Sequence, residues 1–353
     1  MRTLRAIDLF TGAGGLTLGF HKAMEDLGTD FEVVASVELD KDSAKTYAKN
    51  FSPDNQYVGD IGVWVQSNEI PEADIVIGGP PCQGFSLLNK KTAPDPRNQL
   101  WQEYIQVILK SKAKIFVLEN VPPFLKSKEF EEFCSLTNEG GLLEGYSIYS
   151  RVLDSSLLGS PQKRKRGIIV GYQKYLEEPI EFEEREPRNL QDAFQGIPLE
   201  VSGINLPDSQ EFYRTDELHL GRNYTDLSLE RFKHIPPGGN RFDIPDELLS
   251  PCWRKHKSGA ADVMGRLSWD KPSVTIRTEF FKPEKGRYIH PTQDRAITHF
   301  EAARLQGFPD DFLWFGSKVS IARQIGNAVP VQMSHKIFLS LSNSIRKVVS
   351  DGY

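Results

Sequence analysis

The first 171 residues alternate short apolar runs with longer segments whose apolar residues recur at helical intervals. This alternation is typical of a parallel sheet whose strands are joined by crossover helices. The predicted strands are Ala6–Phe10, Glu32–Val37, Ile75–Ile77, Ile115–Leu118, Ser147–Leu153 and Gly167–Val170. The clearest helical patterns between them are Gly15–Leu27, Lys41–Asn50 and Leu100–Lys110. We therefore expect a doubly wound, mostly parallel α/β domain.

The character of the chain changes after Tyr172. Periodicity weakens, and Pro and Gly become frequent, as in the run Ile235–Gly239. Residues 172–230 carry 14 acidic and 5 basic side chains, whereas residues 231–290 carry 12 basic and 7 acidic ones. The overall net charge of -5 thus conceals a basic segment. We expect a smaller, irregular second domain whose basic half can meet a polyanion, and a C-terminal helical pattern at Pro330–Val348 that packs on the first domain.

Composition excludes several classes of protein. With 39% hydrophobic and 26% charged residues, the chain has the make-up of a folded globular protein. Its most apolar runs, Ile115–Leu118 and Ile168–Val170, are far shorter than the ~20 residues that span a bilayer. Since the N-terminus also lacks a secretory signal pattern, we expect a cytoplasmic protein without a membrane segment. Three widely spaced cysteines make neither a disulfide framework nor a zinc site, and the pair Cys252 and His256 is too small a ligand set.

Three glycines, Gly12, Gly14 and Gly15, follow the first predicted strand where the chain turns into a helix. Such a turn lets a ligand approach the backbone closely, although glycine turns also occur where they only connect a strand to a helix. Glu38, at the end of the second strand, stands where a carboxylate can bind ribose hydroxyls. No Gly-Lys-Ser or Gly-Lys-Thr follows the turn. The pattern therefore favours a nucleoside ligand without phosphates.

Other reactive side chains follow further strands of the predicted sheet. Asp60 opens one loop, Cys82 lies in a Gly/Pro-rich loop, and Glu119 ends another strand. Because the carboxyl ends of parallel strands meet at one edge, these residues converge on one crevice. A thiolate there is a strong nucleophile and a carboxylate can exchange a proton, although a lone cysteine is more often buried and inert. Arg164 and Arg166 belong to a charge run that is commonly just solvated, but on one strand both would point at the crevice.

Five motifs occur in order along the chain: Phe-x-Gly-x-Gly-Gly from Phe10, Pro-Cys-Gln-Gly-Phe-Ser from Pro81, Glu-Asn-Val from Glu119, Gln-Lys-Arg-x-Arg from Gln162 and Gln-Ile-Gly-Asn-Ala-Val-Pro from Gln324. Together they resemble the C5-cytosine DNA methyltransferase family. The resemblance covers almost the whole chain except about residues 190–270. Residues 295–309 are similar to a further family motif, with looser matches at His299 and Phe300.

The resemblance implies methyl transfer to carbon 5 of cytosine. That carbon is a poor nucleophile, so the thiolate of Cys82 would add to carbon 6, while Glu119 would hold or protonate N3 and the exocyclic amino group. Arg164 matches the family's catalytic arginine and would bind the base oxygen, with Arg166 supporting it or a neighbouring phosphate. Because the base is stacked inside the duplex, it must first be flipped out.

The resemblance also implies S-adenosylmethionine as methyl donor, S-adenosylhomocysteine as product, and no metal. It assigns the cofactor contacts to strand ends and to the C-terminal segment. They are Phe10, Thr11, Gly12, Ala13, Gly14, Glu38, Leu39, Asp60, Ile61, Pro81, Leu100, Asn327, Ala328 and Val329. Since the last three come from the far end of the chain, we expect a Rossmann-like first domain of residues 1–180 that is completed by residues 320–353.

DNA recognition is expected from residues 181–319 and from the loop that holds the nucleophile. One threonine begins a Thr-aliphatic pair like those of family recognition domains, and basic side chains near it can meet guanines or phosphates. Two polar residues beside the nucleophile would fill the space of the flipped base or contact flanking phosphates. The predicted DNA contacts are Gln83, Ser86, Thr275, Arg277, Lys282, Lys285 and Arg287.

Two other interpretations stay open. A transfer-RNA cytosine methyltransferase has the same fold, but that branch typically carries Pro-Phe-Thr where this chain has Gly84-Phe85-Ser86. A catalytically silent DNA-binding regulator would be expected to lose the nucleophile or the glycine turn, which this chain keeps. The compact length favours a bacterial or phage enzyme. We further expect it to act as a monomer on double-stranded DNA, with a cognate restriction endonuclease as partner in the same system.

Overall fold

The computed structural model describes residues 2–81, 100–208, 210–255, 258–259 and 261–350. The chain divides into two compact units. Unit 1 consists of Met1–Asp154, Lys165–Glu184 and Val331–Tyr353. Unit 2 consists of Ser155–Arg164 and Arg185–Pro330, so a short piece of it interrupts the chain of unit 1 before its main part begins.

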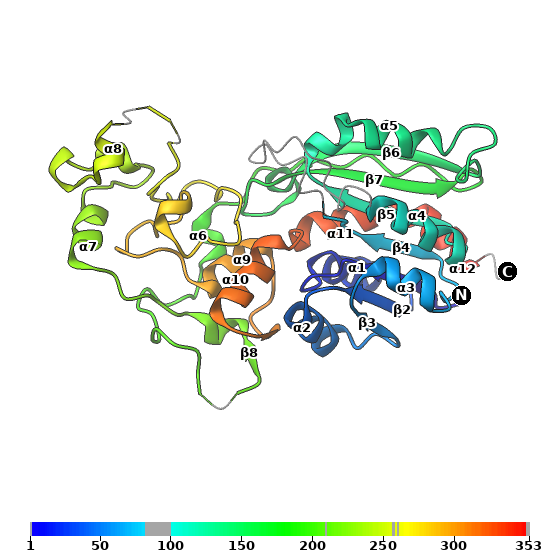
Figure 1. Cartoon of the computed structure of the whole chain (residues 1–353), viewed down its shortest axis with the longest axis horizontal. Coiled ribbons are helices and arrows are strands. Elements are labelled where there is room, and N and C mark those ends of the chain that lie inside the picture. The colour runs from blue at the N-terminus through cyan, green and yellow to red at the C-terminus, as the bar shows by residue number, and fades with distance from the viewer. Residues whose placement is uncertain (1, 82–99, 209, 256–257, 260, 351–353) are drawn as a thin grey trace. The chain divides into compact units, whose positions relative to one another are not determined.

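The described residues of unit 1 form a seven-stranded sheet in the order β3-β2-β1-β4-β5-β7-β6 (Figure 1). Its strands are β1 (Leu4–Leu9), β2 (Phe31–Glu38), β3 (Gln56–Val58), β4 (Ile75–Gly78), β5 (Ile115–Asn120), β6 (Tyr146–Asp154) and β7 (Lys165–Gln173). The strands from β3 to β5 pair in parallel, whereas β7 is antiparallel to both of its neighbours. The doubly wound, mostly parallel sheet predicted from the sequence is thereby confirmed.

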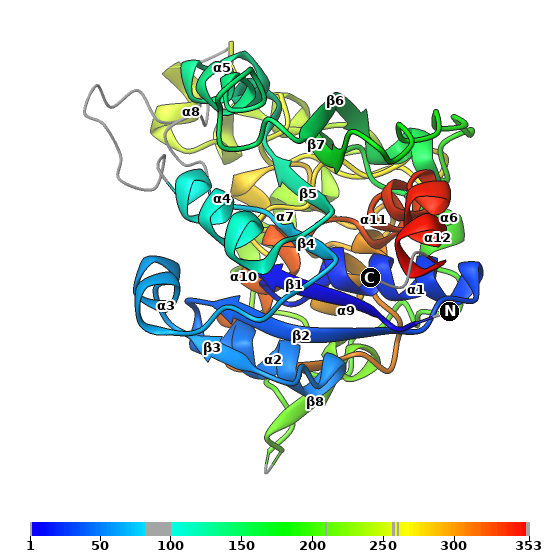
Figure 2. The ribbon, with the colours of Figure 1, turned by 90° about the vertical axis from the view of Figure 1, so that its right-hand side faces the viewer.

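One face of the sheet is covered by α3 (Ile61–Ser67), α4 (Leu100–Ser111) and α5 (Lys128–Ser135) (Figure 2). Each helix contributes a large apolar side chain to a single core with the sheet: Trp64, Tyr104 and Phe133 belong to this core together with Phe116 of β5. The Tyr104 hydroxyl donates to the carbonyls of β4 and β5, at Val76 and Val117. The helical periodicity of these segments thus reflects burial against the sheet.

The other face is covered by α1 (Gly15–Leu27), α2 (Lys41–Phe51), α11 (Val331–Ser340) and α12 (Ser342–Ser350) (Figure 2). Phe20 of α1 meets Phe338 of α11 edge to face, with 4.9 Å between ring centroids. A Cβ on Gly19 would lie 2.3 Å from Ser334, so α1 and α11 approach too closely for any larger residue there. The C-terminal segment therefore packs on the first domain, as its helical pattern predicts.

Three local features differ from the sequence-based expectation. The short edge strand β3 was not predicted, because three residues carry no recognisable alternation. The pattern over Pro330–Val348 forms two helices that break at Leu341, rather than one. The chain rejoins unit 1 at Val331 and not near residue 320, because α10 (Lys318–Asn327) packs on α9 (His299–Gln306) within unit 2. Which unit performs which task stays a prediction.

Unit 2 is as irregular as the sequence predicts. Besides α9 and α10, its described α-helices and strands are α6 (Leu190–Ala193), β8 (Phe212–Arg214), α7 (Asp226–Lys233), α8 (Pro251–Lys255) and β9 (Leu313–Phe315). Where helices and strands are few, buried polar side chains hold the backbone by hydrogen bonds to its carbonyls. The guanidinium of Arg266, which is 4% exposed, donates to the carbonyls of Phe232, Ile235, His290 and Gln293. One side chain thereby joins the end of α7 and the turn after it to residues 290–293.

Two further observations concern the class of protein. No helix within the described part of the chain is long and apolar enough to cross a membrane. Cys252 is exposed, and its Sγ lies 3.1 Å from Ser250 Oγ. His256, the other residue of the small ligand set considered above, lies outside the described residues.

Candidate active site

The chain turns tightly between β1 and α1. Phe10, Gly12 and Gly14 have φ angles of 56°, 53° and 90°, all in the left-handed region. A Cβ on Gly14 would lie 2.1 Å from an aromatic ring of α2, whereas a Cβ on Gly12 would meet nothing within 4 Å. The other predicted contacts of the turn, Thr11 and Ala13, are buried. The turn therefore exposes backbone to open space at Gly12, where a ligand can approach it.

Glu38 ends β2 and is bound to this turn through its carboxylate. The Gly12 N–H donates to Oε2 at 2.7 Å, and the Asp40 N–H donates to Oε1 at 2.8 Å. Burial raises the pKa of Glu38, while these backbone donors oppose the rise. Each oxygen retains a further acceptor position, so the carboxylate is oriented to receive a pair of hydroxyl groups.

The neighbouring strand ends bring other predicted cofactor contacts to the same edge. The Gly59 N–H donates to the Glu38 carbonyl at 2.9 Å, which joins the end of β3 to the end of β2. Asp60 then caps α3, and Ile61 is buried. Leu39 is 70% exposed, so an apolar surface lies beside the Glu38 carboxylate. A ribose and an adenine ring need a carboxylate and an apolar contact of this kind, and these residues therefore fit a nucleoside cofactor.

Asp8 lies behind the turn, in the middle of an apolar strand, and the sequence pattern gave it no role. It is 1% exposed, and its Oδ2 accepts hydrogen bonds from the Thr17 hydroxyl and, at 2.9 Å, from the Tyr47 hydroxyl. Burial raises the pKa of Asp8 to about 7, although both hydroxyl donors oppose the rise. A carboxylate inside an otherwise apolar run is the signal that would have marked it.

The loop that follows β4 is fixed where it begins. A Cβ on Gly78 would lie 2.4 Å from a carbonyl oxygen of β1, so only glycine permits this approach of β4 to β1. The Asn120 side-chain amide, at the end of β5, donates to the Pro80 carbonyl at 3.3 Å. The loop therefore starts from a backbone that two neighbouring strands hold in place.

Pro81 and Leu100 are the described residues on either side of the segment between β4 and α4, and both are half-buried. The predicted nucleophile Cys82 lies outside the described residues, as do the predicted DNA contacts Gln83 and Ser86. Their roles stay predictions from the sequence.

Glu119, at the end of β5, forms an ion pair with Arg166 of β7. The Arg166 Nε and Glu119 Oε1 atoms are 2.5 Å apart, and the side chains are 16% and 13% exposed. A Cβ on Gly79 would lie 3.0 Å from Glu119 Oε2, so the carboxylate also faces the start of the loop that leads to Cys82. A partly buried carboxylate and guanidinium can together bind a planar group with donors and acceptors on one edge.

Arg164 does not share this environment. The prediction that one strand carries both arginines is wrong, because β7 begins at Lys165 and residue 164 belongs to unit 2. There the Arg164 guanidinium donates to the carbonyls of Ile276 at 2.9 Å, Gly326 at 3.1 Å and Asn327 at 3.4 Å. Its two terminal nitrogens therefore donate to backbone carbonyls of unit 2.

A buried amide network, which the sequence pattern does not predict, holds the segment just before β7. Gln162 is fully buried; its Nε2 donates to Gln306 Oε1 at 2.9 Å, and its Oε1 accepts from the Ile276 N–H at 2.8 Å. The Lys163 N–H also donates to the Ser273 carbonyl at 2.8 Å. These bonds draw residues 162–164 into unit 2, which is why the strand starts one residue after Arg164.

The C-terminal cofactor contacts implied by the resemblance also fall in unit 2. Asn327 ends α10, and Ala328 caps it, with its carbonyl accepting from the Gln306 amide at 3.3 Å. Ala328 and Val329 are each 8% exposed. Their contact with a cofactor stays a prediction.

Three of the four basic side chains predicted to contact DNA are engaged within unit 2. Arg287 Nη1 donates to the carbonyls of residues 238–239, both at 2.7 Å, and so holds a glycine turn. Lys282 and Lys285 pair with Glu279 at 2.5 and 3.2 Å. The lysine pairs are partly exposed and therefore weak, whereas the arginine has a structural task.

Arg277 differs from these three residues. It is exposed, and its side chain forms no hydrogen bond or ion pair with any residue that the structure describes. The backbone around it is fixed, because the Thr275 hydroxyl donates to the Lys163 carbonyl at 2.8 Å and a Cβ on Gly326 would lie 2.4 Å from the Thr278 nitrogen. A rigid backbone thus presents an unpaired guanidinium to solvent.

Comparisons with known proteins agree on one family. The family model "C-5 cytosine-specific DNA methylase" matches residues 4–343. The chain is 35% identical over 347 residues to the Type II methyltransferase M1.HphI of Haemophilus parahaemolyticus, covering 95% of this chain and 86% of the relative. It is 31% identical over 351 residues to the Type II methyltransferase M.Eco47II of Escherichia coli, covering 97% and 79%.

A solved structure leads to the same result. A candidate DNA modification methyltransferase encoded within an E. coli prophage superposes with a TM-score of 0.74 at 26% identity, covering 98% of this chain and 100% of that one. The ordered strand-end residues of unit 1, the family model that spans most of the chain and the near-complete coverage of these relatives together show that the chain belongs to the C-5 cytosine-specific DNA methylases.

Proposed function

We propose that the chain methylates carbon 5 of a cytosine in double-stranded DNA and that the pair Glu119 and Arg166 binds the target base. The observation that carries this proposal is the short contact between these two side chains at the carboxyl edge of the sheet. Ligands of open α/β folds bind at that edge. The family supplies the reaction, and the Type II relatives favour DNA over transfer RNA as substrate.

Cys82 is proposed to open the reaction by adding its thiolate to carbon 6, which makes carbon 5 nucleophilic. Glu119 holds the exocyclic amino group and shares a proton with N3, so the charge that develops in the ring is neutralised. Once the new carbon–carbon bond at carbon 5 exists, the carbon 5 proton leaves to a base. The carbon 6–sulfur bond then breaks, and Cys82 departs as thiolate with the ring restored.

Arg166 is a better candidate than Arg164 for the group that binds the base oxygen. Arg166 already contacts Glu119, whereas Arg164 donates to three carbonyls of unit 2. We therefore assign Arg164 a positioning role: it holds the backbone of residues 276 and 326–327. This assignment reverses the order of importance that the resemblance implies for the two arginines.

S-adenosylmethionine, when bound, supplies the electrophilic methyl group. Glu38 is proposed to accept hydrogen bonds from the ribose hydroxyls, and Leu39 to pack on the adenine, with Asp60 near its amino group. The open turn at Gly12 leaves room for the methionine portion. The remaining contacts proposed from the family pattern are Phe10, Thr11, Ala13, Gly14, Ile61, Pro81, Leu100, Asn327, Ala328 and Val329.

Unit 2 is proposed to recognise the DNA sequence, with Thr275 and Arg277 among its contacts and Gln83 and Ser86 near the flipped base. The protein is proposed to act as a monomer beside a cognate restriction endonuclease. Light scattering of the protein alone tests the first point. Survival of phage after transfer of the neighbouring genes together tests the second.

Bisulfite sequencing of DNA from cells that express the chain tests the proposed activity and yields the target sequence. Protected cytosines at one recurring sequence, absent with Glu119→Gln, would support it. No protected cytosines with the unaltered protein would refute the activity, and equal protection with both proteins would refute the role of Glu119. The same sequencing applied to transfer RNA tests the RNA alternative.

A further inference from the structure

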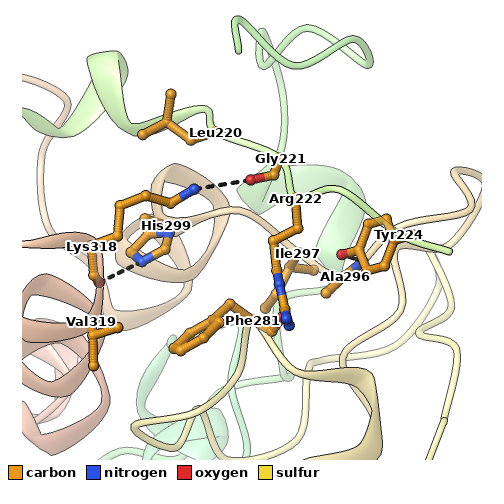
Figure 3. Close-up of a pocket in the computed structure, with 10 residues that line it drawn as sticks. All are labelled: Leu220, Gly221, Arg222, Tyr224, Phe281, Ala296, Ile297, His299, Lys318 and Val319. Carbon is orange, nitrogen blue, oxygen red and sulfur yellow. Dashed lines mark hydrogen bonds between the residues drawn. The ribbon is translucent and has the colours of Figure 1, made fainter. Parts of the chain in front are cut away.

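Unit 2 contains a pocket of about 200 Å³ that none of the proposed catalytic or cofactor residues line (Figure 3). Arg222 and Tyr224 border it on one side, and Lys318 and Val319, at the start of α10, on another. Phe281 lies between Arg222 and Val319 (Figure 3). Because all of these residues belong to unit 2, the pocket is complete within that unit.

Two cations face this pocket without a counter-charge. Lys318 Nζ donates to the carbonyls of Ile204 and, at 3.0 Å, Gly221, and Arg222 Nη1 donates to the Phe281 carbonyl at 2.9 Å. No carboxylate of the described residues forms an ion pair with either cation. Burial and the nearby guanidinium of Arg222 lower the pKa of Lys318. An anion in the pocket would relieve this repulsion.

The rest of the lining suits a flat, apolar group. The Arg222 guanidinium carbon lies 5.9 Å from the centre of the Tyr224 ring and 5.6 Å from that of Phe281. Val319 is 64% exposed at the rim. Aromatic rings interleaved with cations are the surface on which proteins bind unpaired nucleotides, since every base has an apolar face beside a charged phosphate.

His299 adds an unused polar atom to the same lining. It is 2% exposed, and its Nε2 lies 2.8 Å from the Lys318 carbonyl. Burial lowers the pKa of His299 to about 4, so the ring is neutral, and the proton on Nε2 leaves Nδ1 as an acceptor without a partner among the described residues. His299 is also one of the looser matches to the family motif.

We propose that this pocket binds one nucleotide of the DNA substrate, other than the target cytosine, whose base has left the duplex stack. Its phosphate lies between Arg222 and Lys318, and its base lies against Tyr224 and Phe281. The volume of about 200 Å³ is below the roughly 300 Å³ at which pockets for drug-sized ligands begin, so the pocket suits a single nucleotide rather than a whole cofactor. That DNA supplies the nucleotide rests on the proposed function.

The first test uses a fluorescent probe, 2-aminopurine deoxyriboside 5′-monophosphate, whose emission falls when its base contacts an aromatic ring. We expect the monophosphate to bind about tenfold or more tightly than the nucleoside without phosphate, because charged hydrogen bonds hold the phosphate. Arg222→Gln should remove this difference. Arg188→Gln, which removes the same charge from another exposed arginine of unit 2, should keep it. Equal binding of the two probes, or equal effects of the two variants, would overturn the proposal.

The second test fills the pocket with Val319→Trp, an exposed position where folding should be unaffected. Probe binding should be lost, substrate DNA should bind more weakly, and the affinity for S-adenosylhomocysteine should stay unchanged. The monophosphate should also compete with substrate DNA for the unaltered protein. A probe that binds without competing would overturn DNA as the source of the nucleotide. Cytosine methylation by the unaltered protein is read in parallel, so failure of the proposed activity is seen separately from failure of this pocket.

Discussion

The Nε atom of Arg166 and the Oε1 atom of Glu119 lie 2.5 Å apart, and the two side chains are 16% and 13% exposed. Charge-assisted bonds of this length fix both partners and strengthen as water is excluded. The two residues therefore form a preset pair rather than two groups that a substrate must first bring together.

We expect Arg166→Ala to lower kcat by about 10²- to 10³-fold, because it removes a donor at the base and the partner of Glu119. The dissociation constant of S-adenosylhomocysteine should not change. Arg164→Ala should instead lower the melting temperature, because three backbone carbonyls of unit 2 lose their donor. Single-turnover methylation and thermal unfolding measure the two effects. A fall in kcat with Arg164→Lys that exceeds the fall with Arg166→Ala would contradict this division of roles.

Cys82→Ser should abolish methylation while DNA and cofactor still bind, because a serine hydroxyl is almost fully protonated at neutral pH and is a far weaker nucleophile. A duplex with 5-fluorocytosine at the target should trap the unaltered protein covalently, since fluorine blocks the final elimination. Gel electrophoresis under denaturing conditions detects the adduct. An adduct with Cys82→Ser would show that another residue attacks carbon 6.

Glu38→Gln should weaken S-adenosylhomocysteine binding by about ten- to a hundredfold, because charged hydrogen bonds contribute roughly 1.5–3 kcal/mol each. DNA affinity should stay the same. Calorimetric titration gives both constants. Asp42→Asn, at a half-buried acidic residue in the first turn of α2, serves as a control for the loss of charge. A cofactor affinity that follows the control would remove Glu38 from the site.

Arg277 and Arg287 should respond differently to alanine. Arg277→Ala should reduce DNA affinity and either flatten the salt dependence by about one unit, for a phosphate contact, or cost about 1–3 kcal/mol at one base position. Arg287→Ala should reduce the free energy of unfolding by about 1–3 kcal/mol, because the glycine turn it holds loses its donors. Filter binding over a salt series and urea unfolding separate these outcomes. Unaltered DNA binding by Arg277→Ala would exclude Arg277 as a contact.

Asp8 should make stability depend on pH near neutrality. Its folded pKa of about 7 lies above the ordinary value of 3.8, so the folded state holds the proton more tightly than the unfolded state. The stability this provides is complete below pH 3.8 and is lost as the pH rises through 7. Between pH 5 and pH 8 the unaltered protein should therefore lose about 2–3 kcal/mol more unfolding free energy than Asp8→Asn. Parallel curves for the two proteins would contradict the raised pKa.

The sequence predicts the sheet well where strands are buried on both faces. Ile75–Ile77 and Ile115–Leu118 are continuous apolar runs, and they form the centre of the sheet as β4 and β5. The edge strand β3 escaped prediction because half-exposed Gln56–Val58 has no such run. A strand can be recognised in the sequence when it is buried, because burial requires a continuous run of apolar residues.

The site could be predicted where residues follow directly from the ends of neighbouring parallel strands. The glycine turn and Glu38 meet because adjacent parallel strands bring their ends together, and the Gly12 N–H bonds the Glu38 carboxylate accordingly. Arg164 and Arg287 could not be assigned in this way. Their partners, at residues 276 and 238–239, come from distant parts of the chain. The pattern of apolar and polar residues in the sequence does not show that a guanidinium already donates hydrogen bonds to backbone carbonyls.

Ser155–Arg164 belongs to the same compact unit as residues 185–330 although β7 separates the two in the chain. The side-chain amide of Gln162 connects the two segments, because it forms hydrogen bonds with both Ile276 and Gln306. A chimera that takes residues 190–290 from a relative would join foreign residues at 276 to the host's own Gln162. The chimera would therefore acquire the relative's DNA preference only if the transferred segment can form the hydrogen bonds to Gln162. Otherwise the ten residues Ser155–Arg164, just before β7, would have to be exchanged together with the segment.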